Sequence, residues 1–243
     1  MSIRRLFLQK QDTGGGDYPL ANIISEWKFD NNTLDTVGTN DGTGTNITYA
    51  SGLVDQAVVF NSSLRKVIIP NASDLTFTNG SNDLPFSITF AVNSNSVSNN
   101  PRFFDKCATT SQNTNREFRL RAFAGAMEFY LYDGSDVNMA AKATTLTVTN
   151  SVWQHWTVTY DGSGLNSGMS IYRNGVEDSV LVDSGYSGMA NLGEPITIGK
   201  DAFTTTNSLD GKMDCVRFWD KELTATEVIT IATAELAGTD INP

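Results

Sequence analysis

Residues 153–177, WQHWTVTYDGSGLNSGMSIYRNGVE, indicate the fold class of this chain. Apolar and polar residues alternate along Trp153–Tyr160, and a second run of this kind, Met169–Arg173, ends at Asn174-Gly175. Alternation with a period of two is typical of strands that bury one face, and Asp-Gly or Asn-Gly pairs are typical of the turns between strands. The stretch therefore predicts two strands of a β-scaffold that are joined through loops.

The same pattern of short β-runs between turn residues extends over the chain from residue 20 onward. We expect strands at Asn22–Phe29, Ala57–Phe60, Lys66–Ile69, Phe86–Val92, Arg102–Asp105, Glu117–Phe123, Met127–Tyr132, Thr144–Val148, Trp153–Tyr160, Met169–Arg173, Ile196–Gly199 and Lys212–Trp219. Only one helix is indicated, because Thr224 and Glu227 form a capping-box pattern and Leu223 and Val228 stand at hydrophobic-staple positions. The prediction is an all-β fold, a two-sheet antiparallel jelly-roll sandwich with one short C-terminal helix that extends to about Ala234.

Composition narrows the range of partners. Of the 243 residues, 40% are apolar and 18% are charged, and no apolar run approaches the length of a membrane-spanning helix. We therefore expect no membrane insertion. The net charge of −10 also argues against nucleic acid as a partner, because phosphate binding needs clustered Lys and Arg. Cys107 and Cys215 allow one disulfide, but two free thiols are the favoured prediction.

The N-terminal segment, MSIRRLFLQKQDTGGGDYP, has a basic start like a secretory signal. Its apolar core is only Leu6-Phe7-Leu8, which is shorter than the roughly 7 to 15 residues of a signal peptide. We therefore expect residues 1–19 to be a retained attachment arm and residues 20–243 to form the jelly-roll domain. Arg4, Arg5 and Lys10 are the residues of the arm that we expect to contact an assembly partner.

Five stretches, taken in order, resemble the laminin-G-like jelly-roll domains of the concanavalin A-like lectin/glucanase superfamily. They are WKFDNNTLDTVGTNDGT, SGLVDQAVVFNSSLRKVIIPNASDLTF, LPFSITFAV, WQHWTVTYDG with IYRNG, and GKMDCVRFWDKELTATEV. The resemblance covers about residues 20–236 and departs from the family pattern at Ala91 and Cys215. It implies two packed antiparallel sheets with a curved, partly open face. The resemblance does not determine the function of the chain, since the superfamily includes lectins, adhesion modules, glycosidases and structural domains.

Catalysis finds little support in the sequence. His155, the only histidine, has no Gly-x-Ser-x-Gly nucleophile motif to accompany it, so we expect a structural histidine that faces away from Trp156. Related glucanases place their carboxylates as Glu-x-Asp-x-Glu on one strand, and no such triplet occurs here. The nearest pair, Glu128 and Asp133, has an odd spacing that turns the two side chains to opposite faces. We predict that the chain is not an enzyme.

Two kinds of binding site are expected instead. The resemblance implies a structural calcium ion, with Asp35, Asn40 and Asp214 as its ligands; the alternative is that such residues cap turns. Glycan binding usually needs exposed aromatic rings, and Tyr49, Tyr186 and Phe203 lie in predicted loops. The alternative for these three is anchoring of their loops. Arg119 and Arg121 share one face of a strand, which is expected to be solvated or to contact an acidic partner.

The leading hypothesis is a non-enzymatic bacteriophage virion protein, either a capsid decoration or a fibre protein. Its lectin-like domain would bind host-surface glycans, and its arm would join other virion proteins in a homo-oligomer, so its expected location is the virion. The alternative is a free carbohydrate-binding lectin, either cytoplasmic or exported without a standard signal. A glycoside hydrolase is the third and least favoured hypothesis.

Overall fold

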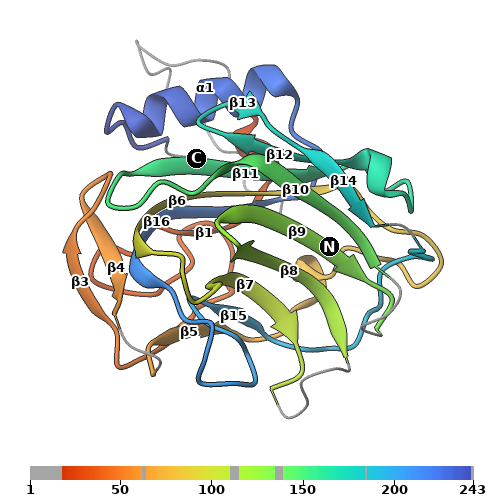
Figure 1. Ribbon diagram of the computed structural model, residues 1–243, viewed down its shortest axis with the longest axis horizontal. Helices are drawn as coiled ribbons and strands as arrows, with labels where there is room; N and C mark the ends of the chain where they lie inside the picture. The colour runs from red at the N-terminus through yellow and green to blue at the C-terminus, as the bar shows by residue number, and fades with distance from the viewer. Residues whose placement is uncertain (1–17, 62–63, 110–114, 135–138, 184, 242–243) are drawn as a thin grey trace, which may run out of the picture.

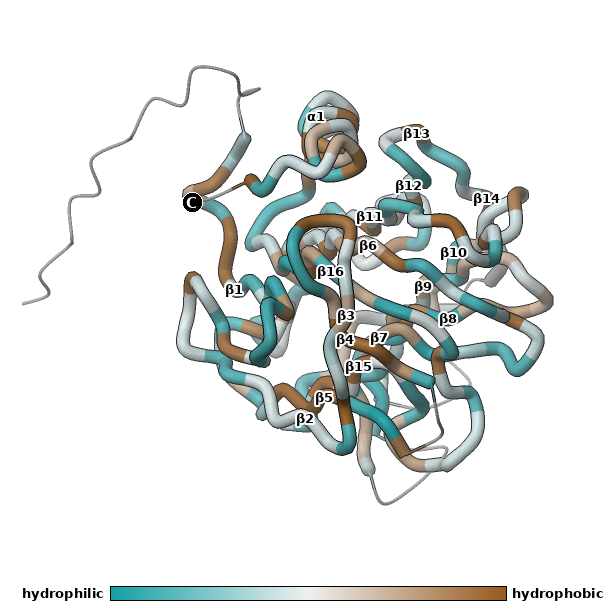
Figure 2. Tube along the Cα trace, turned by 90° about the vertical axis from the view of Figure 1, so that its left-hand side faces the viewer, coloured by the Kyte–Doolittle hydropathy of each residue, from teal (hydrophilic) through white to brown (hydrophobic). Residues whose placement is uncertain are grey.

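The computed structural model describes residues 18–61, 64–109, 115–134, 139–183 and 185–241. Within these residues two antiparallel sheets of eight strands pack face to face, which confirms the predicted sandwich. Figure 1 looks onto strands β7, β8, β9 and β10 of the second sheet, which lie in front of β6, β11 and β16 of the first. Figure 2 shows the helix as a further layer above β11, β6 and β16.

The first sheet is built around two long central strands. Its order is β13 (Val176–Glu177), β12 (Met169–Arg173), β11 (Gln154–Tyr160), β6 (Phe86–Ser96), β16 (Asp210–Trp219), β4 (Gln56–Phe60) and β3 (Thr48–Ser51), and β1 (Ile23–Trp27) also pairs with β16. The two strands predicted in the stretch at 153–177 are confirmed as β11 and β12, and the structure pairs them with each other.

The second sheet runs from β14 (Val180–Asp183) through β10 (Met139–Thr147), β9 (Ala126–Tyr132), β8 (Arg116–Phe123), β7 (Arg102–Cys107), β15 (Ile196–Ile198) and β5 (Lys66–Ile69) to β2 (Thr43–Thr45). Short 3₁₀ turns occur at Leu20–Asn22, Ser73–Leu75 and Asn166–Gly168. The inner faces of the two sheets form one apolar core, in which Trp27 and Trp156 are fully buried. Cys107 and Cys215 are both buried free thiols, as expected.

Helix α1 (Ala225–Leu236) covers the outer face of the first sheet. The Thr224 side chain accepts from the backbone N–H of Glu227, and the Glu227 side chain accepts from the N–H of Thr224, so the predicted capping box is confirmed. Leu223 and Val228 lie in the apolar cluster beneath the helix together with Trp219 of β16. In the described part of the chain, no helix is both long and apolar enough to cross a membrane.

A buried ionic cluster also joins α1 to the first sheet. Arg217 of β16 is fully buried and forms ion pairs with Glu26 of β1, at 2.6 Å, and with Glu235 of α1. Burial alone would raise the pKa of Glu235, but the Arg217 guanidinium and the neighbouring His155 hold that pKa below its usual value. Glu235 is therefore ionised at neutral pH and paired.

His155 belongs to this cluster and is fully buried. Its Nε2 lies 3.0 Å from Oε2 of Glu235, a close contact that is poorly aligned for a hydrogen bond. Trp156 points into the core on the other side of β11, as the alternation predicts. His155 is thus a structural residue beneath the helix, and its acidic neighbour is 80 positions away in the sequence.

Candidate functional site

The outer face of the second sheet carries a charged and aromatic surface, which follows from the alternation along β8 and β9. Phe118, Leu120 and Ala122 of β8 point into the core, so Arg119, Arg121 and Phe123 point outward. In the same way, Met127, Phe129 and Leu131 of β9 are core residues, so Glu128, Tyr130 and Tyr132 point outward. This face turns toward the viewer in Figure 1.

Arg119 and Asp105 lie opposite each other on β8 and β7 and form a bidentate ion pair. Nε donates to Oδ1 at 2.9 Å and Nη2 donates to Oδ2 at 2.8 Å. Arg119 is only 3% exposed, so the expectation of a solvated face is wrong for this residue. Asp105 could not be predicted as its partner, because the register of β7 with β8 is not a local signal in the sequence.

Arg121 is bound by two neighbours on β9. Its Nε donates to Oε2 of Glu128 at 2.6 Å, and its Nη2 donates to the Tyr130 hydroxyl at 2.8 Å. That hydroxyl donates in turn to Oε2 of Glu128 at 2.7 Å. Burial and the hydrogen bond to Glu128 raise the pKa of Tyr130, so its hydroxyl remains a donor at neutral pH. The guanidinium also lies 4.7 Å from the centre of the Phe123 ring.

Arg102, at the start of β7, faces Arg121 across the strands but lacks such partners. It is 8% exposed, and its Nε lies 3.6 Å from Oδ2 of Asp201, which is too far for a hydrogen bond. Within the described residues, Nε and Nη1 are buried and have no hydrogen-bond partner. Burial, followed by the positive charges of Arg119 and Arg121, lowers the pKa of Arg102 to about 10.

Two exposed phenyl rings lie on the segments that carry the neighbours of Arg102: Phe123 follows Arg121 on β8, and Phe203 follows Asp201 in its loop. Phe123 is 47% exposed at the β8–β9 turn, and Phe203 is 43% exposed in the loop between β15 and β16. Hydrogen bonds hold this loop in place, since Asp201 Oδ1 accepts from the N–H groups of Phe203 and Thr204 at 3.0 and 2.9 Å. We refer to Arg102, Arg121, Glu128, Tyr130 and Asp201, with Phe123 and Phe203 at the rim, as the Arg102 site.

Hydrogen bonds from backbone N–H groups connect the loops around the Arg102 site. The Arg102 N–H donates to the carbonyl of Asn207 at 2.9 Å, and Ala202 N–H donates to Asp105 Oδ2 at 3.2 Å. The turn that carries Phe123 is joined to the same region, because Ala124 N–H donates to Asn100 Oδ1 at 3.1 Å. The two rings are therefore presented by segments fixed to one end of the sheet.

Of the three predicted glycan-binding residues, Phe203 alone belongs to the Arg102 site. Tyr49 lies in β3 of the first sheet and packs against the core. Tyr186 also packs against the core, and its hydroxyl donates to Asp83 Oδ2 at 2.6 Å, so it anchors its loop. Phe123 and Tyr130 were missed, although the alternation in 117–132 placed them on one face with Arg121. A glycan role for any of these residues stays a prediction.

Two of the three predicted calcium ligands, Asp35 and Asp214, accept hydrogen bonds from backbone N–H groups. Both oxygens of Asp35 accept backbone N–H groups: Oδ1 from Glu26, Val37 and Gly38, and Oδ2 from Asn40. Asp214 belongs to β16, and its Oδ2 accepts from the backbone N–H groups of Leu53 and Val54 at 2.9 Å each. No group of three or more His, Cys, Asp or Glu residues in the described ranges could hold a metal ion. Calcium binding stays a prediction, and the contacts match the turn-capping alternative.

Asp214 leads to a pH-dependence prediction. It is 1% exposed, and burial raises its pKa from 3.8 to about 7 even though Val54, Cys215 and Leu53 donate N–H groups to it. The folded state therefore holds the proton more tightly than the unfolded state, and stability is lost as the pH rises from 4 to 7. Relative to Asp214→Asn, the wild-type free energy of unfolding should fall by up to about 4 kcal/mol over this range. Urea titrations of both proteins at each pH would measure it, and parallel curves would contradict it.

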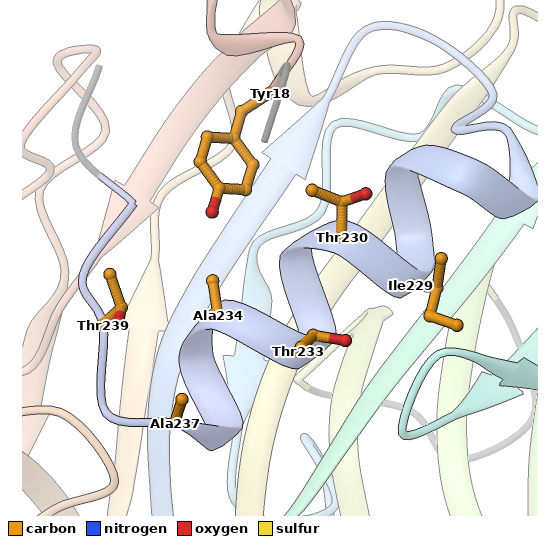
Figure 3. A pocket seen from close by; sticks show the side chains of 7 residues that line it. All are labelled: Tyr18, Ile229, Thr230, Thr233, Ala234, Ala237 and Thr239. Carbon is orange, nitrogen blue, oxygen red and sulfur yellow. The ribbon is translucent and has the colours of Figure 1, made fainter. Parts of the chain in front are cut away.

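A hollow lies on the outer side of α1. Figure 3 shows its lining, formed by Tyr18, Ile229, Thr230, Thr233, Ala234, Ala237 and Thr239. Apart from the Tyr18 phenol, these side chains have no titratable group, and none is charged at neutral pH. The Arg102 site is therefore the better candidate for specific recognition.

Comparisons with known proteins agree with the fold. A family model described as the concanavalin A-like lectin/glucanases superfamily matches residues 65–229. No match was found among curated proteins. Domain 4 of AbnA, an extracellular GH43 arabinanase of Geobacillus stearothermophilus solved in complex with arabinotriose, superposes with a TM-score of 0.66 at 19% identity and covers 87% of this chain and 98% of its own.

Two toxin domains are similar as well. The binding domain of Paraclostridial Mosquitocidal Protein 1 has a TM-score of 0.66 at 15% identity over 88% of this chain and 52% of its own. The binding domain of botulinum neurotoxin DC in complex with SialylT has a TM-score of 0.63 at 17% identity. The match covers 88% of this chain and 51% of the neurotoxin domain. This chain thus spans about half the length of each toxin domain. At these identities the likeness establishes the fold.

Proposed function

The chain belongs to the concanavalin A-like lectin/glucanase superfamily, and we propose that it is a non-enzymatic carbohydrate-binding domain whose glycan site is the Arg102 site. The observation that carries this proposal is the pair of exposed rings, Phe123 and Phe203, beside a guanidinium with unused N–H groups. A sugar has an apolar C–H surface and a rim of hydroxyl groups, so it needs both an aromatic ring and fixed polar partners.

The polar part of the site is held in position by its own hydrogen bonds. Arg121, Glu128 and Tyr130 bind one another, and Asp201 is fixed by its loop, so little side-chain entropy remains to be lost on binding. The arabinotriose complex of the arabinanase domain and the SialylT complex of the neurotoxin domain support carbohydrate binding as a use of this fold. The residues of the present site are this chain's own.

The charged groups favour binding over glycoside hydrolysis. A glycosidase needs two carboxyl groups that flank the bond to be cleaved. On this face, Asp105 is held by both donors of the Arg119 fork and Glu128 by Arg121 and Tyr130. Both carboxylates are thus bound by neighbouring side chains. Asp201, the third carboxylate of this face, uses Oδ1 to cap the Phe203 loop, so the arrangement suits a binding surface.

Removal of the Phe123 ring should weaken glycan binding. We expect Phe123→Ala to raise the dissociation constant about fivefold, because ring contacts of this kind contribute about 1 kcal/mol. The ring is half exposed, so the fold should be retained. A glycan array would identify a ligand, and isothermal titration of wild type and variant would give both constants. Val176→Ala, an exposed apolar position in β13 of the first sheet, is the control. Equal constants for Phe123→Ala and wild type would place the glycan elsewhere, and no binding on the array would refute the proposed function.

Attachment to a larger particle remains a separate proposal. Arg4, Arg5 and Lys10 lie outside the described residues, so the arm, its virion partners and the homo-oligomer stay predictions. Tyr18, near the end of the predicted arm, and Leu20, just after it, pack against the apolar cluster beneath α1. The free-lectin alternative uses the same glycan site but predicts a monomer that is not attached to a particle.

A further inference from the structure

Arg102 differs from the neighbouring arginines on the same face. Arg119 has a bidentate carboxylate partner, and Arg121 is bound by Glu128 and Tyr130. Within the described residues, the Arg102 guanidinium makes no hydrogen bond, and its one ion pair is the 3.6 Å contact with Asp201. Asp201 uses its other oxygen to cap the Phe203 loop. Among Arg102, Arg119 and Arg121, Arg102 is therefore the one whose guanidinium donors have no hydrogen-bond partner within the described residues.

Such an arginine is unfavourable for folding. A buried charged donor without a hydrogen-bond partner loses its hydration without replacement, and it also lies near the positive charges of Arg119 and Arg121. The lowered pKa of Arg102 reflects both effects. Groups of this kind in native proteins call for an explanation, and binding of a ligand that supplies the missing acceptors is one.

We propose that the glycan bound at the Arg102 site carries a carboxylate, and that Arg102 binds this carboxylate through its unused donors. This inference rests on the proposed function and specifies its ligand as an acidic sugar. A guanidinium matches the two oxygens of a carboxylate in a planar, bidentate arrangement. Phe123 and Phe203, at the rim, provide the surfaces for the sugar ring.

The surrounding charges favour a carboxylate over a phosphate. Asp105, Asp201 and Glu128 already balance much of the positive charge of this face. A doubly charged phosphate would be repelled by these three carboxylates more strongly than a singly charged group. A carboxylate on a uronic acid and one on a sialic acid present the same chemistry to Arg102, so the test must include both kinds of sugar.

The test uses matched pairs of glycans on the full chain: sialyllactose with lactose, and an oligogalacturonate with its methyl ester. A sulfated oligosaccharide with its desulfated form is a third pair. We expect at least one carboxylated glycan to bind about tenfold or more tightly than its neutral partner. Equal affinity within both carboxylate pairs, or a preference confined to the sulfated pair, would overturn the inference and leave the proposed function standing. No binding in any pair, or on the array, would overturn both.

Two variants connect the preference to Arg102. Arg102→Gln should bind the acidic glycan about 10 to 100 times more weakly and its neutral partner almost unchanged, since a charge-assisted contact is lost. Arg102→Lys keeps the charge but loses the planar fork, so its affinity should be intermediate. Arg173→Gln of β12 is the matched control and should keep the wild-type preference.

The melting temperature separates a binding role from a structural one. Because Arg102 has unsatisfied donors, Arg102→Gln should leave the melting temperature unchanged or raise it. A preference for the acidic glycan that persists in a folded Arg102→Gln variant would overturn the inference. So would a marked loss of stability in both Arg102→Gln and Arg102→Lys, because it would show that Arg102 is a structural residue.

Discussion

Replacement of Arg217 by glutamine is expected to lower the free energy of unfolding by about 3 to 5 kcal/mol. Arg217 is fully buried and paired with Glu26 and Glu235, which are fully buried as well. Without the guanidinium, two carboxylates would remain in the interior with incomplete compensation, and the loss of one partner from a buried pair has this magnitude. Urea titration followed by tryptophan fluorescence would measure the change.

A matched variant separates the role of Arg217 from a general effect of charge. Arg173→Gln makes the same change at a partly exposed position of the same sheet and should alter stability by less than about 0.5 kcal/mol. The triple variant Glu26→Gln/Arg217→Met/Glu235→Gln should be more stable than Arg217→Gln, since it leaves no buried charge uncompensated in these three positions. Equal losses for Arg217→Gln and Arg173→Gln would contradict the ionic cluster as described.

Phe218→Ala should be comparably destabilising, by about 3 to 5 kcal/mol. The Phe218 ring of β16 lies 5.7 Å from that of Trp27, and it also meets two rings of the second sheet, Phe104 at 5.9 Å and Phe118 at 6.2 Å. Its removal would leave a cavity between the two sheets and take away contacts to both. Thermal and urea unfolding would report the loss.

Phe203→Ala removes the same ring from an exposed loop and is the natural control for Phe218→Ala. It should change stability by no more than about 0.5 kcal/mol, because its ring does not belong to the described core. If Phe218→Ala cost less than about 1 kcal/mol, the proposed joining of the sheets through this ring would be wrong.

The sequence predicted the sandwich because alternation and turn residues are local signals. The capping box at Thr224 and the strands at 117–132 were placed almost to the residue. The edge strands β2, β3, β13 and β14 were missed, because strands of two to four residues show too few alternations. The first part of β10, Met139–Ala143, was also missed, since Ala and Lys have low strand propensity.

The candidate site was harder to predict, because its pairs join distant segments. Asp201 reaches Arg102 across almost 100 positions, and His155 meets Glu235 across 80. Pairing of this kind depends on strand order, which composition and periodicity do not specify. Phe203 was recognised as an exposed loop aromatic, whereas Phe123 was treated only as part of a strand. The burial of Arg119 against Asp105 required the register of β7 with β8.

The most direct test of the central claim is the crystal structure of the chain with its best-binding glycan. We predict the sugar on the outer face of the second sheet, in contact with Phe123 or Phe203 and within hydrogen-bond distance of the Arg102 guanidinium. A glycan bound in the hollow beside Tyr18 and Thr233, or at the loops around Asp83, with the Arg102 site empty, would contradict the account.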